Sequence, residues 1–418
     1  MPTRFPRFYL LIILLVALCL RVITVVSLNL AAESDYAGYQ SMAQNFISGA
    51  GMTDGVNMAF LSAGYPLLIL APVFAITGNN ILAAQLVNAL LGTISVLLCY
   101  MVTRQAGAGR LGGLIAASLF ALYIPSWVYA EYLAKENLMT PLMLAVIWCA
   151  LKLMQKALFS TAMLCGVLLG LLSLVGNAAL SIAGAVVLAL FFVMEKPGHK
   201  IKCLFVIMML AVITASPWIV RNYLVIGAPV VNSNSGFNLY IGNNPSADGL
   251  FVSVKDTPIG PEWETLRKEK GEMGASRVLG QLALEWIKEH PANALKLGVK
   301  KAILFWMPPV HEGKGEQSKS ESLVRMAWLA QFLVLVIGAI SGLFFKALRN
   351  RTTLIVWATV TGYTAIHMLF YVVFRYREPL MPFLCVLCAL AIEQAWEKYD
   401  LKSFFRNRSP DAENYRMG

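Results

Sequence analysis

Apolar runs separated by short polar gaps make up most of the chain. Ten of these runs are predicted to cross a membrane as helices, and they cover residues 8–29, 80–103, 111–129, 130–156, 161–177, 179–194, 203–220, 323–345, 353–374 and 380–396. A shorter apolar stretch, residues 64–78, is interrupted by Pro66 and Pro72, so we expect a juxtamembrane helix near the outer surface, with a tilted span as the alternative. The pattern predicts an all-α polytopic membrane protein.

Lys and Arg occupy alternate gaps between these runs. They occur within residues 104–110, 152–156, 196–202 and 346–351, whereas no Lys or Arg lies between Arg21 and Arg104. Because basic loops stay in the cytoplasm, both chain ends are predicted to be cytoplasmic and the remaining gaps extracytoplasmic.

One long polar stretch, residues 223–322, interrupts the pattern, and its charges nearly cancel. Residues 282–287 and 294–305 have the spacing of amphipathic helices, so we expect a small mixed extracytoplasmic segment here. The chain then divides into an N-terminal transmembrane module with its first outer loop, the extracytoplasmic region, the C-terminal helices and a cytoplasmic tail. These parts cover residues 1–222 with the loop at 30–78, then 223–322, 323–396 and 397–418.

Composition excludes a soluble protein with a large core, since 58% of the 418 residues are hydrophobic, 14% are charged and the mean hydropathy is +0.65. The net charge of +11 would suit a nucleic-acid-binding protein, but the basic residues lie in the gaps, so we expect membrane lipids and no nucleic acid as partners.

All seven Cys lie in or beside apolar runs, which argues against a disulfide framework. Cys385-x-x-Cys388 has a redox or metal spacing, but packing inside a helix is its expected role.

The first outer loop contains the acidic residues Glu33, Asp35 and Asp54 without a nearby cation. Between them, YAGYQSMAQNF has one apolar stripe at helical spacing, so a short helix is expected directly after Asp35. Two interpretations of Asp35 follow from this position. It caps the helix, or it is an ionised acid that takes part in chemistry.

Further ionisable residues are predicted to lie on the same side of the membrane, at the ends of helices: Lys135, Glu136, Arg221, Arg375 and Arg377. Outward-facing cations depart from the charge rule for membrane proteins and need another explanation. Carboxylates on one wall of a site and guanidinium groups on another suit the departure of a phosphate while a carboxylate removes a proton from a nucleophile. The alternative is that the arginines bind lipid headgroups and the acids cap helices.

Four short segments follow one another along the chain. The first is an early Asp followed by Tyr, a small-residue turn and GYP, within residues 35–66. The others are EYLAKENL, SPWIVRNYLVIGAPVVNSNSGFNLYIGNNPSADG and FRYREPLMP, at residues 131–138, 216–249 and 374–382. Together they resemble the GT-C superfamily of integral-membrane glycosyltransferases, and within it the bacterial family 39 type, which is related to protein mannosyltransferases and the aminoarabinose transferase of lipid A.

The resemblance implies an inverting transfer of a sugar from a polyprenyl-phosphate donor to an acceptor hydroxyl of a glycan, a lipid or a protein, on the outer face of a bacterial cytoplasmic membrane. It implies Asp35 as general base and Glu136 as a second acidic group. The cations implied to hold the donor phosphate are Arg375, Arg377, Lys135 and Arg221. The residues implied for the acceptor surface or lid are Tyr39, Tyr65, Asn234, Asn238, Asn243 and Asn244, although each Asn equally fits a structural loop.

Two departures from the family pattern bear on the site. Relatives carry a basic residue near the outer end of the fifth helix, where this chain has Val-Gly-Asn at residues 175–177, and their two neighbouring acids are here Glu-Ser-Asp at residues 33–35. The phosphate-binding set and the participation of a metal are therefore open.

His290 and His311 lie apart, so no zinc site is expected, and no cofactor is predicted. His367 is expected to make an interhelical hydrogen bond, with a position at the site as the alternative.

Two other classes of protein fit part of the pattern. A transporter or flippase for lipid-linked sugars needs a polar pathway, but the helix centres are almost free of ionisable residues apart from Arg21 and His367. An O-antigen polymerase or ligase also has a large outer loop and outward arginines, but it places its key residues mainly in late loops.

Arg21 is expected to face the protein interior and to meet an acid such as Glu33.

Overall fold

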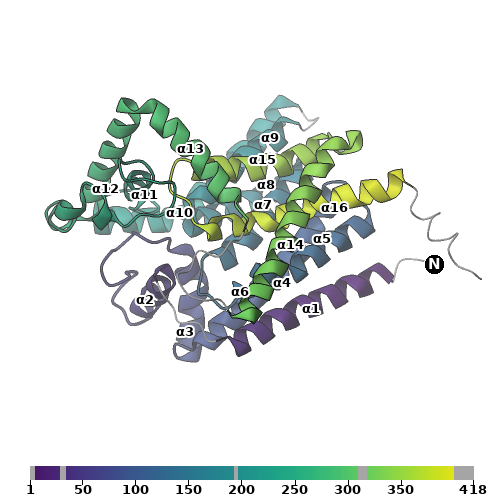
Figure 1. The fold of residues 1–418 in the computed structure, drawn as a ribbon, viewed down its shortest axis with the longest axis horizontal. Coiled ribbons are helices and arrows are strands. Elements are labelled where there is room, and N and C mark those ends of the chain that lie inside the picture. The colour runs from purple at the N-terminus through teal and green to yellow at the C-terminus, as the bar shows by residue number, and fades with distance from the viewer. Residues whose placement is uncertain (1–4, 29–33, 193–195, 309–317, 400–418) are drawn as a thin grey trace, which may run out of the picture.

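The protein is a bundle of long helices with shorter helices gathered at one end. The computed structural model describes residues 5–28, 34–192, 196–308 and 318–399. Figure 1 shows α2 (Asp35–Ile47), α11 (Ser235–Gly242) and α12 (Trp263–Glu289) at the same end of the bundle, and α13 (Pro291–Trp306) leading from α12 back to it. This end is called the outer end below.

Each of the ten predicted apolar runs contains a helix. The helices of the bundle are α1 (Phe5–Ser27), α4 (Ile81–Gln105), α5 (Arg110–Leu122), α7 (Glu136–Gln155), α8 (Phe159–Val175), α9 (Ile182–Phe191), α10 (Pro197–Ile226), α14 (Lys319–Ser341), α15 (Arg351–His367) and α16 (Met381–Lys398). Among the described residues, α1, α4, α7, α10, α14 and α16 are long and apolar enough to cross a membrane by themselves. The all-α membrane architecture is confirmed, and the number of crossings stays a prediction.

Short helices connect or extend these elements. They are η1 (Pro66–Leu70), α3 (Ala71–Thr77), α6 (Ile124–Val128), η2 (Asn177–Ser181), η3 (Val254–Asp256), η4 (Gly260–Glu262), η5 (Gly342–Phe344), η6 (Lys346–Leu348) and η7 (Phe374–Leu380). The predicted juxtamembrane helix is η1 with α3, and the two predicted amphipathic segments lie within α12 and α13.

Several predicted boundaries were wrong for local reasons. α10 includes residues 197–202 of the basic gap, because Pro197 stands at the first helical turn, where its missing N–H is not needed. It continues to Gly227, whose left-handed conformation at φ 70° ends it. The predicted helix 111–129 breaks at Tyr123, which has an extended backbone conformation, and Pro125 stands in the first turn of the new helix α6.

The start of α7 also differs from the prediction. The helix begins at Glu136, whereas the preceding residues form turns. The side-chain amide of Asn137 donates to the carbonyls of Tyr129, Tyr132 and Ala134 at 2.9–3.2 Å, which ties this turn to the helix. Lys135 and Glu136 therefore stand together at the first turn of a deeply buried helix.

Glycines let α8 and α10 approach each other closely. A Cβ atom at Gly166 on α8 would lie 2.7 Å from the carbonyl oxygen of Ile207, and one at Gly170 would lie 2.7 Å from that of Ala211. The spacing Gly166-x-x-x-Gly170 places both on one helix face, the arrangement that brings backbones together in membrane helices.

Arg21 is fully buried in the bundle, as expected, but it meets neutral groups. Its guanidinium donates to the Ala17 carbonyl and to the Ser126 hydroxyl, both at 2.9 Å. The predicted partner, Glu33, lies outside the described residues. Gly92 on α4 leaves the space that the guanidinium occupies, because a Cβ atom there would clash with it.

Replacing Gly166 by Val is expected to destabilise the protein by about 1–3 kcal/mol, because the added side chain overlaps the backbone of α10. Thermal unfolding of the purified protein in detergent measures the change. Gly184→Val is the matched control, since a Cβ at that position meets no other described part of the protein within 4 Å beyond its own helix backbone and chain neighbours. Equal unfolding temperatures for the two variants would contradict close packing of α8 on α10.

Candidate active site

An ion pair joins the beginning of the chain to its end. The carboxylate of Asp35 accepts a hydrogen bond from the guanidinium of Arg375, which belongs to η7. Asp35 is the first residue of α2, and the residue at the N-cap position is Ser34. The interpretation of Asp35 as the N-cap is therefore wrong, and its carboxylate is instead held by a cation 340 residues away.

A second carboxylate faces the same guanidinium. Oε1 of Glu136 lies 4.0 Å from Nε of Arg375, and this Nε is buried without a hydrogen-bond partner in the described structure. The rings of Tyr36 and Tyr376 lie 5.2 and 5.7 Å from the guanidinium carbon, within the range of cation–π interactions. Arg375 is thus held between two acids and two aromatic rings.

The two carboxylates differ in their access to water. The side chain of Asp35 is 34% exposed, whereas that of Glu136 is 5% exposed. Burial also raises the pKa of the neighbouring Tyr36 hydroxyl, so this phenol stays neutral and the two acids are left as the candidate proton acceptors. Of the two acids, Asp35 is the one that an incoming molecule can reach directly.

A cavity of about 110 Å³ adjoins this cluster and is called the outer cavity. Glu136 and Tyr376, both neighbours of Arg375, form part of its wall. Further polar groups enter it from the starts of α7 and α11, from η2 and from the segment around the end of α15: Lys135, Asn177, Asn234, Asn238, His367 and Tyr371. Polar groups from five separate regions of the sequence, η7 with Tyr376 included, therefore meet at one place.

Two predicted phosphate ligands lie elsewhere. Arg377 is fully buried and donates to the carbonyls of Phe305 and Met307, so it holds the end of α13. Arg221 donates to the carbonyls of Met52 and Met58 at 2.9 and 2.7 Å. Neither side chain lines the outer cavity, because each is used to fix a backbone segment.

Four residues predicted for the acceptor surface or lid have structural contacts instead. Tyr39 and Tyr65 are buried against each other beneath α2, and the Tyr65 hydroxyl donates to Asn88 at 2.9 Å. Asn243 donates to the carbonyls of Leu239 and Leu369, and Asn244 to those of Tyr240 and Ile241. Only Asn234 and Asn238 of the predicted set line the outer cavity.

Sequence reasoning missed two groups near the site. Asn177 lines the outer cavity and donates to Asn232 at 2.7 Å, at the position where relatives are expected to have a basic residue. Lys301 on α13 is fully buried, and its ammonium donates to Asn243 and to the Met368 carbonyl, both at 3.2 Å. In the sequence, Lys301 is one of several lysines at the spacing of a solvated helix face, so no signal distinguished it.

His367 takes the second of the two roles that the sequence left open, because it lines the outer cavity, and its hydrogen bond to a carbonyl lies within α15 and is not interhelical. Its Nδ1 lies 2.8 Å from the Tyr363 carbonyl within α15, and its ring lines the outer cavity 5.3 Å from that of Tyr376. Within the described ranges, no three His, Cys, Asp or Glu side chains gather closely enough to hold a metal ion. The participation of a metal stays untested.

Part of the chain matches a known family. A model of the family "Dolichyl-phosphate-mannose-protein mannosyltransferase" matches residues 65–220, a segment that includes Lys135 and Glu136 but neither Asp35 nor Arg375. A search of curated proteins found no match.

Solved structures resemble nearly the whole chain. The archaeal oligosaccharyltransferase AglB from Archaeoglobus fulgidus, in complex with an inhibitory peptide and a dolichol-phosphate, has a TM-score of 0.56 at 13% identity, covering 97% of this chain and 52% of that chain. The oligosaccharyltransferase of that organism tethered to an acceptor peptide has a TM-score of 0.55 at 13% identity, covering 97% and 51%. ArnT from Cupriavidus metallidurans bound to undecaprenyl phosphate has a TM-score of 0.46 at 13% identity, covering 95% and 80%.

These similarities concern the fold. The chain spans about half the length of the oligosaccharyltransferase that it matches. Over that length its fold resembles that of a membrane oligosaccharyltransferase, in agreement with the GT-C-like fold that the sequence resemblance implied. The assignment to the bacterial family 39 type stays a prediction.

Burial lowers the pKa of Lys301 to about 8, so the protein should gain stability relative to a Lys301→Gln variant as the pH rises from about 8 to about 10. In this window the unfolded chain still holds the proton that the folded protein has released, because the ordinary pKa of Lys is about 10.4. Raising the pH therefore favours the folded state. Thermal unfolding of both proteins across this range measures the effect.

Lys300→Gln is the matched control for this prediction, since Lys300 is the exposed neighbour on the same helix. Its difference from the wild type is expected to stay constant with pH. A constant difference for Lys301→Gln as well would show that the buried ammonium keeps its ordinary pKa.

Proposed function

We propose that this chain, which has the GT-C fold, is a membrane glycosyltransferase. It moves a sugar from a polyprenyl-phosphate donor to an acceptor hydroxyl at the extracytoplasmic face of a bacterial cytoplasmic membrane. The observation that carries the proposal is the cluster of Asp35, Arg375 and Glu136 beside the outer cavity. The family match over residues 65–220 and the likeness to an oligosaccharyltransferase support the same class of reaction.

On binding, the donor phosphate would displace the Asp35 carboxylate from the guanidinium of Arg375. Arg375 can bind a phosphate through two parallel N–H groups, and its buried Nε is without a hydrogen-bond partner in the described structure. Lys135, which lines the outer cavity, adds a second positive charge. Binding of the donor would thereby release the Asp35 carboxylate for its role as a base.

The proposed transfer forms one bond to the sugar and breaks another. The acceptor oxygen forms a bond to the anomeric carbon of the sugar while the bond from that carbon to the phosphate oxygen breaks. The proton of the acceptor hydroxyl passes to Asp35, and the phosphate departs with the bonding electrons. Arg375 and Lys135 stabilise the negative charge that develops on the leaving phosphate. Attack opposite to the leaving group inverts the anomeric centre.

Glu136 has a different role in this proposal. Its carboxylate is almost completely buried, so an acceptor cannot reach it as easily as Asp35. It lies 4.0 Å from Nε of Arg375, where its charge keeps the guanidinium in place after the Asp35–Arg375 ion pair breaks. Asn234 and Asn238, which also line the outer cavity, offer hydrogen bonds to sugar hydroxyls.

Replacing Asp35 by Asn is expected to reduce turnover by about 10²–10⁴-fold, because the amide cannot accept the proton of the acceptor. The assay incubates the purified protein with a panel of polyprenyl-phosphate sugars and an envelope extract as the source of acceptors, and measures release of polyprenyl phosphate. Unchanged thermal unfolding of the variant shows that folding is retained.

Asp54→Asn is the control for this substitution. Asp54 belongs to the same outer loop, but its carboxylate accepts hydrogen bonds from Val56 and Asn57 of its own turn. Its replacement should leave turnover within about twofold, since Asn retains an acceptor oxygen for the turn. Similar turnover in the two variants would remove Asp35 from the mechanism.

Arg375→Lys and Arg377→Lys should separate binding of the donor from folding. Lysine keeps the charge but loses the planar pair of donors, so Arg375→Lys is expected to lower kcat/KM by at least about tenfold with little change in Tm. Arg377→Lys should lower Tm, because two carbonyls at the end of α13 lose their donors, while turnover per folded molecule is kept. The reverse pattern would assign the phosphate to Arg377.

A further inference from the structure

Another cavity at the outer end is called the aromatic cavity and has a volume of about 190 Å³. Its main lining residues come from the first outer loop, from α11 and from α12, which lie together in Figure 1: Asn57, Phe60, Phe237, Trp263, Arg267 and Glu272. Three of them, Asn57, Arg267 and Glu272, also line an open groove of about 570 Å³, so the aromatic cavity has an opening to solvent. None of these side chains takes part in the proposed transfer.

Three aromatic rings form one surface of this cavity. The ring centroid of Phe237 lies 5.2 Å from that of Phe60 and 5.7 Å from that of Trp263. Phe60 and Phe237 are half-buried, and Trp263 is 9% exposed. Contiguous rings in a cavity bind a flat apolar face of a ligand. The C–H groups of a sugar ring form such a face.

Polar groups surround the rings. The guanidinium of Arg267 lies 5.6 Å from the Trp263 ring and donates to Asn57 at 2.9 Å, which uses one of its five N–H groups. Within the described ranges, the indole N–H of Trp263 has no hydrogen-bond partner, and its nitrogen is not among the enclosed polar atoms that lack one. The hydroxyl of Ser276 also belongs to the lining. Such groups beside an aromatic surface match the hydroxyl groups at the edge of a sugar ring.

The walls of the aromatic cavity are fixed by hydrogen bonds between its three segments. The carboxylate of Glu272 on α12 accepts from the backbone N–H groups of Met58 and Ala59, at 2.7 and 3.1 Å, and from the Ser233 hydroxyl. The backbone N–H of Ser233, just before α11, donates to the Ala59 carbonyl at 2.9 Å. A preformed cavity of this kind binds a ligand without the cost of ordering its walls.

The charges of the lining favour a neutral ligand. Among the described residues that line the cavity, the cation Arg267 and the anion Glu272 cancel in formal charge. An anionic ligand would meet the carboxylate, and a cationic ligand would meet the guanidinium. A purely apolar ligand would leave both charges desolvated. A neutral ligand with many hydroxyl groups avoids these costs.

The aromatic cavity lies next to the outer cavity. On α11, Asn234 and Asn238 line the outer cavity, whereas Phe237 lines the aromatic cavity. In the first outer loop, Ser62 lines the outer cavity and Phe60 the aromatic cavity. The same two segments thus form walls of both cavities, which places the aromatic cavity within reach of an extended ligand that also enters the outer cavity.

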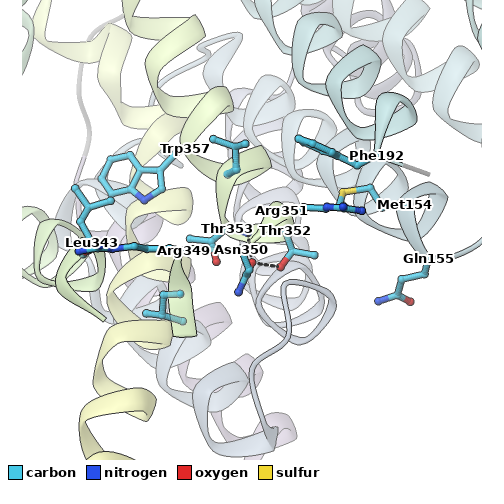
Figure 2. Close-up of a pocket in the computed structure, with 12 residues that line it drawn as sticks. Met154, Gln155, Phe192, Leu343, Arg349, Asn350, Arg351, Thr352, Thr353 and Trp357 are labelled. Carbon is cyan, nitrogen blue, oxygen red and sulfur yellow. Dashed lines mark hydrogen bonds between the residues drawn. The ribbon is translucent and has the colours of Figure 1, made fainter. Parts of the chain in front are cut away.

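A larger cavity, of about 990 Å³, lies at the opposite end of the bundle and has a different lining (Figure 2). Figure 2 shows its two aromatic rings, Trp357 and Phe192, on opposite sides of Asn350 and Thr352. Rings that stand apart do not form one surface for the face of a sugar. The contiguous rings therefore distinguish the aromatic cavity.

We propose that the aromatic cavity binds a neutral sugar ring of the acceptor, which makes the acceptor a glycan. This inference rests on the proposed function, because it names the acceptor class of that reaction. The ring packs on Phe237 and Trp263, and its hydroxyl groups accept hydrogen bonds from Arg267 and from the indole N–H. Another ring of the same glycan presents its hydroxyl to Asp35 beside the outer cavity.

The test measures sugar binding without a donor, so its result does not depend on turnover. The purified full chain, in a phosphocholine detergent without a sugar headgroup, is titrated with methyl β-glucoside, methyl α-mannoside and methyl β-galactoside, and saturation-transfer NMR follows binding. At least one hexoside is expected to bind at least about fivefold more tightly than methyl β-glucuronide or a neutral peptide rich in Ser and Thr. No binding by the three hexosides, or equal binding by the glucuronide or the peptide, would overturn the proposal.

Variants locate the sugar. Trp263→Leu should weaken hexoside binding about tenfold through loss of the aromatic face, and Arg267→Gln about fivefold through loss of charged donors. Trp286→Leu and Arg277→Gln on the same helix are the matched controls, since neither residue lines the cavity. Thermal unfolding identifies a variant that fails to fold, and the half-buried Arg267 then provides the comparison. Equal hexoside binding by cavity variants and controls would contradict the proposed site.

Asp35→Asn separates this inference from the proposed function. Asp35 does not line the aromatic cavity, so this variant should bind the hexoside as the wild type does while its turnover falls. Hexoside binding combined with turnover that is independent of Asp35 would contradict the proposed function alone. Turnover that depends on Asp35, without hexoside binding, would contradict this inference alone.

Discussion

A buried guanidinium needs negative charge around it, and in this protein the charge has to come from distant parts of the chain. Taking Arg375 out of water costs several kcal/mol unless carboxylates compensate it. Asp35 from the first outer loop and Glu136 from the start of α7 supply them. The ion pairs can form only when α2, α7 and η7 come together at the outer end. The same electrostatic requirement that joins these elements therefore also places an acid and a cation beside one cavity.

The binding partners of four cations at the outer end distinguish those that fix the structure from the one that can take part in chemistry. Arg377, Arg221 and Lys301 donate to backbone carbonyls or to an amide, which are neutral and belong to segments that these cations hold in place. Arg375 is paired with carboxylates, and an incoming anion can replace a carboxylate at a guanidinium without leaving it uncompensated. These four cations, which look alike in the sequence, therefore divide into three that fix the backbone and one, Arg375, whose partner an anion can replace.

Positive charge at the outer end is compensated inside the protein. Arg375 is paired with two acids, so a ligand must compete with them for the guanidinium. One of these acids, Glu136, belongs to the first turn of α7, which ties the cluster to a long helix of the bundle.

The apolar periodicity by itself determined the helical membrane architecture, because a run of apolar residues has no other stable way to satisfy its backbone in a bilayer. The alternation of basic gaps also predicted that Asp35, Lys135, Glu136 and Arg375 lie on one side of the membrane, because it assigns a side to every loop. Only the tertiary structure decided which of these groups meet. Arg375 and Arg377 are two residues apart, yet one faces Asp35 and the other faces the end of α13, and Lys301 is buried although its neighbours are solvated. Such differences depend on how elements pack at the outer end, and the contacts involved join residues 58 to 340 positions apart, which local spacing cannot encode.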